Sequence, residues 1–370
     1  MGRLTAQKII LNIYQELENL LFELIQIALG NKDRLSHNPS KEEWENLFLD
    51  AQKQSVVGIA FEGVQKLPKE QWPSQALLFE WIGTCEQIKI QNQIANKRSV
   101  EISRMFADAG FKSCILKGQG NALMYDNPFC RMSGDIDIWV DGTRDNINKF
   151  VRNRCPDAFE QEHHIEFPIF KDVEVEVHYK PCTLLSSSAN RNFLKWCNTI
   201  KAIQMGNEVE LPESAGNVAV PTAEFNAVFQ MAHIMIHFFI EGIGLRHFVD
   251  YYYVLKTNTN HTDIANLFKE FGLFRFARGV MWIEKECLGL EDQYLLVEPN
   301  ERSGRVILKE MMEGGNFGHY DERYKSREKG YIARGLTDVY RLMKLASIFP
   351  SESMWKIYRK IGNQKWKINN

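Results

Sequence analysis

The short stretch from Asp135 to Val140 restricts the fold more than any other part of the chain. Acidic and large apolar residues alternate in it, so in a β-strand Asp135 and Asp137 project from one face while Ile136 and Ile138 project from the other. Two ionised carboxylates side by side repel each other unless a cation lies between them. Because hard oxygen ligands favour Mg²⁺ or Mn²⁺, the stretch predicts a strand that is apolar on one face and binds a metal on the other.

The β-rich part of the chain is confined to its middle. Runs of β-branched and apolar residues predict strands over 112–116, 135–140, 163–170 and 173–178, with a turn at Lys171-Asp172 between the last two. Short helices are expected over 119–125 and 143–152. The order strand, helix, strand, helix, strand, strand predicts a small mixed sheet with flanking helices, and therefore an α+β core.

Helical periodicity dominates on both sides of this core. Before it, helices are expected over about 5–30, from a capping box at Ser40 and Glu43 to about 50, and over 74–109 with Gly110 as the terminating glycine. After it, helices are expected over 222–240, 245–256, 261–271, 274–287 and 331–346, with a glycine-rich break at 314–318 before the last. The chain is therefore divided into an N-terminal helical region (1–109), an α+β core (110–220) and a C-terminal helical region with a basic tail (221–370).

A second acidic strand follows the first. In Val173 to His178, Glu174, Glu176 and His178 share one face, so this strand offers a third carboxylate. Alternating Val and Glu is also typical of an ordinary half-buried strand, so at most one of the two glutamates is expected to be a ligand, and Glu176 is favoured. Three carboxylates on adjacent strands suit an in-line displacement assisted by two metal ions.

A glycine turn precedes the acidic strand. In Lys117-Gly118-Gln119-Gly120 the Gly118 turn enters a short helix, so that backbone N–H groups can approach phosphate oxygens. Lys117 adds a positive charge. These residues predict a phosphate site next to the carboxylates.

Together these residues resemble the polymerase-beta-type nucleotidyltransferase superfamily, whose pattern is a strand, a glycine turn and helix, a D-x-D strand and a later strand with one more acid. More narrowly, the chain is similar to uncharacterised bacterial nucleotidyltransferases of that fold over about residues 110–255. The similarity rests on Leu116-Lys117-Gly118, Tyr125, Pro128, Arg131, Gly134 to Val140, Glu176-Val177-His178, Gly242 to Arg246 and Asp250.

The resemblance implies a site and a reaction. The implied metal ligands and catalytic acids are Asp135, Asp137 and Glu176, and the implied nucleotide-binding residues are Lys117, Gly118, Gln119, Arg131, Ser133 and Arg246. The expected reaction transfers a nucleoside monophosphate from a triphosphate such as ATP to an acceptor hydroxyl and releases pyrophosphate. The acceptor is a sugar, another small molecule, a protein side chain or an RNA end, since no motif distinguishes these.

Two other functions are compatible with the same residues. Gln119 stands where the superfamily turn commonly carries serine, which favours a catalytically inactive module that binds a nucleotide or a partner. His233 and His237 are four residues apart on one helical face, so a phosphohydrolase using them with the aspartates would release phosphate instead. They are otherwise expected to border the cleft or to pack in the core. Arg246 and Asp250, also four apart, either face the nucleotide or form an intrahelical ion pair.

Net charge, apolar stretches and cysteines limit the kinds of partner and the cell compartment that are expected. A net charge of −2 argues against a protein that coats nucleic acid, and the longest apolar stretches are too interrupted to cross a membrane. Seven scattered cysteines without a secretory leader indicate reduced thiols in the cytoplasm. Residues 323–370 carry twelve Lys or Arg against three acids, with Trp355 and Tyr358 among them. This basic segment is either a surface helix or a contact for an anionic acceptor or membrane headgroups.

Overall fold

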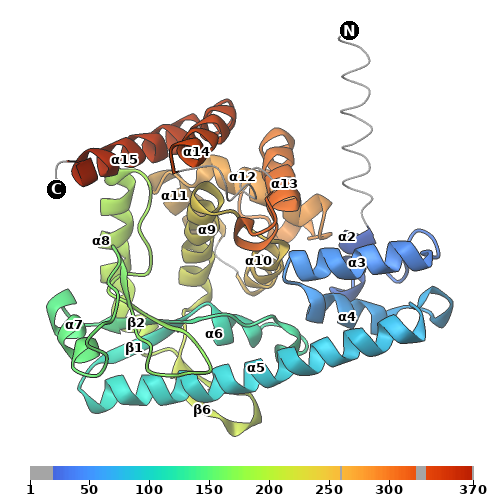
Figure 1. The fold of residues 1–370 in the computed structure, drawn as a ribbon, viewed down its shortest axis with the longest axis horizontal. Helices are drawn as coiled ribbons and strands as arrows, with labels where there is room; N and C mark the ends of the chain where they lie inside the picture. The colour runs from blue at the N-terminus through green and yellow to red at the C-terminus, as the bar shows by residue number, and fades with distance from the viewer. Residues whose placement is uncertain (1–19, 259–260, 322–330, 369–370) are drawn as a thin grey trace.

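The computed structural model describes residues 20–258, 261–321 and 331–368, and the middle part of the chain forms a four-stranded mixed sheet. In Figure 1 the first two strands of this sheet lie just above the long helix at the bottom of the view. The strands are β1 (Lys112–Leu116), β2 (Ile136–Asp141), β3 (His164–Glu166) and β4 (Val175–His178), in the spatial order β1-β2-β4-β3. β2 pairs parallel with β4, and the β1–β2 and β3–β4 pairs are antiparallel. The predicted mixed sheet and α+β class are confirmed.

The two faces of the sheet have different environments. Ile115, Ile138 and Val177 point to a face that packs on α5 (Gln75–Asp108) and α7 (Arg144–Arg152), in a cluster completed by Phe106 and Phe150. The opposite face is covered at one end only, where Trp139 stacks on Phe225 of α9 (Ala223–Ile240) at 5.7 Å between ring centroids. The acidic end of that face is left facing a cleft.

The helices before the sheet form one packed group. They are α2 (Leu20–Ala28), α3 (Lys41–Lys53), α4 (Val57–Lys66) and α5, with short 3₁₀ turns at Lys69–Gln71 and, after the sheet begins, Pro128–Cys130. Both hydrogen bonds of the predicted capping box between Ser40 and Glu43 are present, at 2.8 and 3.2 Å. Gly110 has a φ of 84° just past the end of α5, as expected of a terminating glycine.

The remaining helices lie on the other side of the sheet from α5 (Figure 1). They are α8 (Ser187–Gln204), α9, α10 (Leu245–Thr257), α11 (His261–Glu270), α12 (Phe274–Glu286), α13 (Glu301–Gly314), α14 (Tyr331–Leu345) and α15 (Pro350–Ile368). Short 3₁₀ turns cover Pro212–Ser214, Asp292–Tyr294 and Asn316–Gly318. Buried side chains from α2–α4 and from α9–α13 belong to one hydrophobic cluster, so the two helical regions share a core. The division at 109 and 220 stays a prediction.

The structure corrects several expected bounds. The two strands expected over 163–170 and 173–178 are only three and four residues long, because Pro168 has no N–H to donate to a strand pairing and residues 167–174 form a loop. The helix expected over 119–125 is α6 (Gly118–Ala122). The pattern does not predict α4, α8, α13 or the hairpin of β5 (Glu208–Leu211) and β6 (Gly216–Ala219). A helix, which is one interpretation of the basic C-terminal segment, is present there as α15. Of the helix expected over 5–30, residues 5–19 lie outside the described residues.

Two general features complete the description. All seven cysteines are free thiols. Within the described ranges, no helix combines the length and the apolar character that crossing a bilayer requires.

Candidate active site

The acidic end of the sheet opens into two adjoining cavities. The central cleft, of about 870 Å³, is bounded by the sheet, by α9 and α10, and by the turn at Asn316–Gly318. A second, acidic cavity of about 770 Å³ lies beside it over the loop 167–174. Both are lined by Ser133, Gly134, Asp135, Glu174 and Glu176, so the two cavities meet at the carboxylates.

The predicted site residues converge on the central cleft. All of them line it except Gln119: they are Lys117, Gly118, Arg131, Ser133, Asp135, Asp137, Glu176 and Arg246. His233 and His237 line it as well, in agreement with the expectation that they border the cleft. Segments more than 100 residues apart in the sequence therefore meet in one place.

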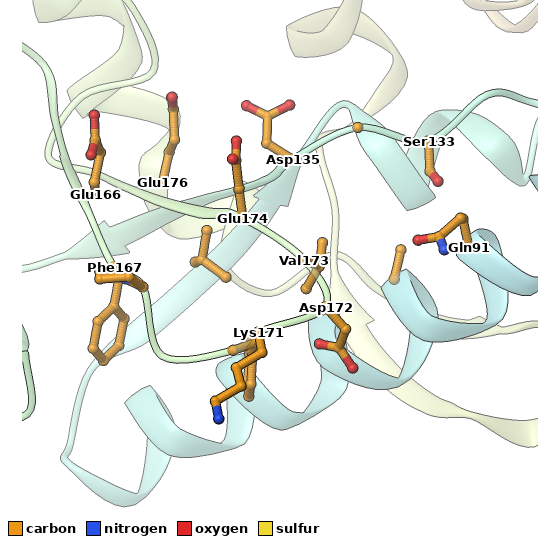
Figure 2. Close-up of a pocket in the computed structure, with 15 residues that line it drawn as sticks. Gln91, Ser133, Asp135, Glu166, Phe167, Lys171, Asp172, Val173, Glu174 and Glu176 are labelled. Carbon is orange, nitrogen blue, oxygen red and sulfur yellow. The ribbon is translucent and has the colours of Figure 1, made fainter.

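The carboxylates are positioned by the parallel pairing of two strands. Asp137 of β2 is in register with Glu176 of β4, and Asp135 lies just before β2. The carboxylates of Asp135, Glu174, Glu176 and Glu166 rise from the same side of the sheet (Figure 2). Because successive strand residues alternate in direction, this register brings all the acids to one face.

Asp137 is held by two basic groups. Its carboxylate accepts from Lys117 Nζ at 2.9 Å and from His178 Nε2 at 2.9 Å, and the side chain is buried. Burial alone would raise its pKa, but the charges and hydrogen bonds of Lys117 and His178 hold the pKa below its ordinary value. Burial likewise opposes protonation of His178, but the hydrogen bonds from this ring to Asp137 and Glu176 raise its pKa to about 9. Asp137 is therefore ionised throughout the neutral range.

Asp135 is in a different electrostatic situation. It makes no hydrogen bond with a described residue, and repulsion from Asp137 is the main reason why its pKa is raised, with burial adding to it. Lys117 and Arg246 oppose that shift. Asp135 is thus a more basic carboxylate than an ordinary aspartate and lies where both cavities can reach it.

The turn that carries Lys117 is strained. Lys117 has a φ of 51° and Gly118 a φ of 44°, and positive φ is costly for a residue with a Cβ. The strained turn sends the Lys117 side chain across the cleft, where Nζ lies 2.9 Å from both Asp137 Oδ2 and His233 Nε2. Burial lowers the pKa of Lys117, but the negative charges of Asp137 and Asp135 outweigh burial and raise it. This lysine therefore stays cationic although it is half-buried.

Gln119 is the predicted residue that the structure does not bring to the cleft. Its side chain is buried, and its amide nitrogen donates to the side-chain oxygen of Asn96 and, at 3.4 Å, to the carbonyl oxygen of Asn92, both on α5. The side chain thus fastens α6 to α5. Its backbone remains next to the Gly118 turn.

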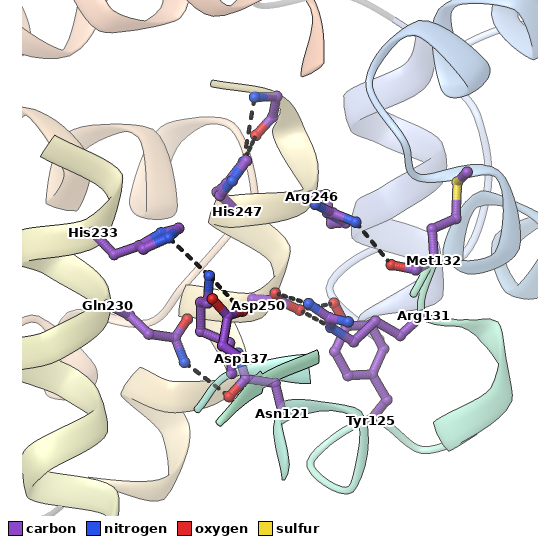
Figure 3. A network of polar contacts seen from close by, with 12 residues as sticks. Asn121, Tyr125, Arg131, Met132, Asp137, Gln230, His233, Arg246, His247 and Asp250 are labelled. Carbon is purple, nitrogen blue, oxygen red and sulfur yellow. Dashed lines mark hydrogen bonds and ion pairs between the residues drawn. The ribbon is translucent and has the colours of Figure 1, made fainter. Parts of the chain in front are cut away.

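Arg131 is fixed by a buried ion pair. Its Nε and Nη2 donate to the two carboxylate oxygens of Asp250 at 2.8 Å each, and the Tyr125 hydroxyl donates to the same carboxylate at 2.7 Å (Figure 3). The third nitrogen, Nη1, is buried without a hydrogen-bond partner among the described residues. Because Asp250 pairs with Arg131, Arg246 is not engaged with Asp250 in an intrahelical ion pair; its Nη1 donates to the carbonyl oxygen of Met132 at 3.0 Å.

The wall opposite the carboxylates is rich in histidine. His233 Nε2 lies 2.9 Å from His237 Nε2, and burial lowers the pKa of His233 well below its usual value, so this ring is neutral. Arg359 of α15 also lines the cleft and donates to the carbonyl oxygen of Leu184 at 3.0 Å. Part of the basic C-terminal segment thus reaches the cleft, while residues 323–330 lie outside the described residues.

The sequence interpretation missed a group of histidines at the end of the sheet. His163, His164 and His178 line the cleft beside Glu176. His178 pairs in register with His164 across β3 and β4. The available signals were the adjacent pair His163-His164 in an expected strand and the position of His178 on the acidic face of the next strand.

The carboxylates fit a divalent cation. Asp137, Glu176 and His178 each offer a ligand atom, and these atoms lie within 4.8 Å of one another. Asp135 is not in that group, but it extends the acidic surface of the same cleft. Oxygen-rich donors with a neighbouring imidazole suit Mg²⁺ or Mn²⁺, the ions expected from the sequence.

Fold and cleft together define a class of protein: an α+β chain in which carboxylates on a sheet face lysine and arginine side chains across a cleft. Comparison with known families agrees with this class. The chain belongs to the family of uncharacterised nucleotidyltransferases, whose model matches residues 40–289, from the start of α3 to just beyond α12. No curated protein matches the chain. The match covers more of the chain than the residues 110–255 of the sequence resemblance, and includes helices α3 to α5.

Proposed function

We propose that this protein is a metal-dependent nucleotidyltransferase that moves a nucleoside monophosphate from a nucleoside triphosphate to an acceptor hydroxyl and releases pyrophosphate. The observation that carries the proposal is the meeting of Asp135, Asp137 and Glu176 with Lys117 and Arg246 in one cleft. A triphosphate needs cations around it, and membership of the nucleotidyltransferase family supports this substrate.

Asp135, Asp137 and Glu176 are the residues proposed to hold Mg²⁺ or Mn²⁺. When bound, the metal would neutralise phosphate charge and lower the pKa of an attacking hydroxyl. His178 donates to Asp137 at 2.9 Å, which fixes the orientation of that carboxylate.

The cationic wall is proposed to bind the triphosphate. Lys117 and Arg246 supply positive charge, and the unpartnered Nη1 of Arg131 is a donor already positioned by Asp250. The Gly118 backbone, with no Cβ and nothing within 4 Å of the place where one would stand, leaves room for a phosphate. Packing places these groups in the cleft beforehand, and Lys117 would exchange its contact with Asp137 for a phosphate when a metal binds that carboxylate.

In the transfer step, the acceptor oxygen forms a bond to the α-phosphorus while the bond from that phosphorus to the bridging oxygen breaks. The departing pyrophosphate keeps the bonding electrons, and its charge is stabilised by Lys117 and Arg246. The acceptor's proton passes to a carboxylate at the junction of the two cavities, where Asp135 and Glu176 lie. The acceptor is proposed to arrive through the acidic cavity, where it meets the triphosphate at Asp135.

The cysteines and Arg359 suggest the cell compartment and the charge of the acceptor. All seven cysteines are free thiols, which suits the reducing cytoplasm. Arg359 at the edge of the cleft suits an acceptor or cofactor with negative charge. ATP, CTP, GTP and UTP are all candidate donors.

The decisive variant is Asp135→Asn. Asp137 is a poor choice, because removing one member of a buried ion pair destabilises the fold as well as the site. Asp135 has no hydrogen bond to lose, so Asp135→Asn is expected to fold normally and to lower transfer by at least about 100-fold. Incubation with each triphosphate, Mg²⁺ and a cell extract, followed by assay of pyrophosphate and labelled products, measures the effect.

A matched control lies on the same strand. Asp141 ends β2, is exposed and bonds Lys201 at 3.0 Å away from the cleft, so Asp141→Asn should retain transfer. Wild-type pyrophosphate release by Asp135→Asn would contradict the proposal. Release of inorganic phosphate instead of pyrophosphate would favour the phosphohydrolase.

An inactive nucleotide-binding module is the second candidate, and Gln119 favours it. Its side chain is committed to Asn96 and cannot take the place of the serine that commonly follows the glycine in the superfamily turn. Metal-dependent binding of a triphosphate in calorimetry, with no pyrophosphate formed in any extract, would support this module over the enzyme.

A further inference from the structure

We infer that His163, His164 and His178 form a second metal site, of the nitrogen-rich type that takes Zn²⁺, beside the carboxylates. Each of these residues offers a ring nitrogen, and the three nitrogens lie within 4.8 Å of one another. This inference does not depend on nucleotidyl transfer, because zinc binding is measured without nucleotide, although the two sites are neighbours that both include His178.

The three rings are brought together by the short strands. His164 is opposite His178 in the antiparallel β3–β4 pair, and His163 directly precedes β3. The ring centroids are 4.7 Å apart for His163 and His164, 5.2 Å for His164 and His178, and 5.4 Å for His163 and His178. Two strands and the residue before β3 thus bring three imidazole rings close together.

The ring nitrogens of His164 have no hydrogen bond to occupy them. The residue is only 4% exposed, yet neither nitrogen forms a hydrogen bond with any described residue. Nδ1 lies 3.3 Å from Glu176 Oε2, but this approach does not have hydrogen-bond geometry. A buried polar atom without a partner destabilises the fold, and a metal ion would satisfy it.

His178 is arranged as a metal ligand with a supporting carboxylate. Its Nε2 donates to Asp137 at 2.9 Å, and its Nδ1 is buried without a hydrogen-bond partner among the described residues. In metal-binding histidines one nitrogen usually binds the ion while the other donates to a carboxylate, which fixes the ring and its tautomer. Asp137 has that supporting role here, and Nδ1 is the nitrogen left for the ion, which would take the place of the proton on that atom.

The donor set decides which ion fits. Imidazole nitrogens favour Zn²⁺ and similar transition metals, whereas Mg²⁺ prefers oxygen. Glu176, beside His164, can complete a four-coordinate site or leave the fourth position to water. All three histidines line the central cleft, and an ion arriving from solvent would meet the half-buried ring of His163 first. A bound ion would clamp β3 to β4 and hold His178 against Asp137.

Binding of Zn²⁺ and Co²⁺ to the full-length, metal-stripped protein tests the inference, in excess Mg²⁺ and without nucleotide. We expect one tightly bound Zn²⁺ per chain by elemental analysis, and visible absorption typical of four-coordinate Co²⁺. Zn²⁺ should also raise the melting temperature, since an ion that binds only the folded state stabilises it.

The variants separate this site from its neighbours. His163→Gln removes a half-buried ring with little risk to the fold, and it should lose the Co²⁺ absorption and weaken Zn²⁺ by at least about tenfold, as should His164→Gln. His237→Gln is the matched control, because it removes a histidine from the other cluster in the same cleft, and it should keep the ion. Asp135→Asn should also keep it.

Three outcomes would overturn the inference: no zinc retained by the wild-type protein, zinc retained by His163→Gln, or zinc lost from His237→Gln alone. The histidines would then be an aromatic cluster that packs β3 on β4. The outcomes do not overlap with those of the proposed function. Zinc binding without pyrophosphate release would contradict the proposed transferase activity and would still support the zinc site.

Discussion

At the scale of single residues, the buried charges of this protein differ in whether they have partners. Asp137, Lys117 and His178 satisfy one another at the cleft. Glu284 of α12 is fully buried, and neither of its carboxylate oxygens has a hydrogen-bond partner among the described residues. Burial raises the pKa of Glu284 well above the usual 4.5. The protein therefore keeps a protonated glutamate inside its helical core.

Glu284 should make stability depend on pH. Between the unfolded pKa near 4.5 and the raised folded pKa, the folded state holds a proton that the unfolded state has released, so stability falls as pH rises through this window. Glu284→Gln removes the titration, so its unfolding free energy should gain on that of the wild type as pH rises from 5 to 8, by about 1.4 kcal/mol for each pH unit inside the window.

Chemical denaturation at several pH values measures this difference. The control is Glu286→Gln, at an exposed position of the same helix, which should leave the pH dependence of the wild type unchanged. Parallel stability curves for Glu284→Gln and the wild type would show that the carboxyl group is not held protonated.

At the scale of elements, the cleft depends on how closely α4 approaches the 3₁₀ turn Pro128–Cys130. A Cβ at Gly58 of α4 would stand 2.0 Å from the carbonyl oxygen of Cys130, which is backbone and cannot move aside alone. Arg131 follows directly and carries the ion pair with Asp250. Only glycine at position 58 allows this approach, so α4 helps to place Arg131.

Gly58→Ala should therefore damage both stability and the site. We expect a loss of about 1–3 kcal/mol or more from overpacking, together with weaker triphosphate binding as Arg131 shifts. Gly83→Ala on the exposed side of α5, where nothing lies within 4 Å, should instead stabilise the protein by about 0.5–1 kcal/mol. Equal stability of the two variants, measured by denaturant unfolding, would argue against the close approach of α4 to the turn.

At the scale of the whole molecule, the C-terminal helices belong to the main core although the family match ends at residue 289. Phe349, between α14 and α15, is fully buried and lies 5.6 Å from Phe276 and 6.0 Å from Phe238 between ring centroids. Arg341 of α14 donates to the carbonyl oxygen of Phe238 at 2.7 Å. These contacts hold α15, and with it Arg359, at the edge of the cleft.

Phe349→Ala should consequently act on the whole fold. Loss of a fully buried phenylalanine typically costs about 3–5 kcal/mol, and undocking of α15 should also weaken binding in the cleft through Arg359. Tyr340→Ala on α14, at a residue 61% exposed, should change the unfolding free energy by less than about 0.5 kcal/mol. A similar small effect for both variants would mean that the C-terminal helices are not part of the cooperative core.

Regular local patterns allowed much of the fold to be predicted. β1 has the expected bounds and α5 ends at the expected glycine, because alternation and helical spacing act within a few residues. The hairpin of β5 and β6 has no such signal of its own. A two-stranded hairpin is marginal alone and is stabilised here by apolar side chains such as Val218 that pack into the cluster under the sheet.

The sequence by itself determined that Asp135 and Asp137 belong to an acidic side of the sheet at one strand, that a glycine turn precedes them, and that helices surround an α+β core. Only the tertiary structure decided which groups meet across long separations: Lys117 with His233, 116 residues away, and Arg131 with Asp250, 119 residues away. It also turned Gln119 toward α5 and brought His163 and His164 beside His178. Periodicity specifies which face a side chain occupies, whereas register and packing between distant elements specify its neighbours, and these depend on the whole core.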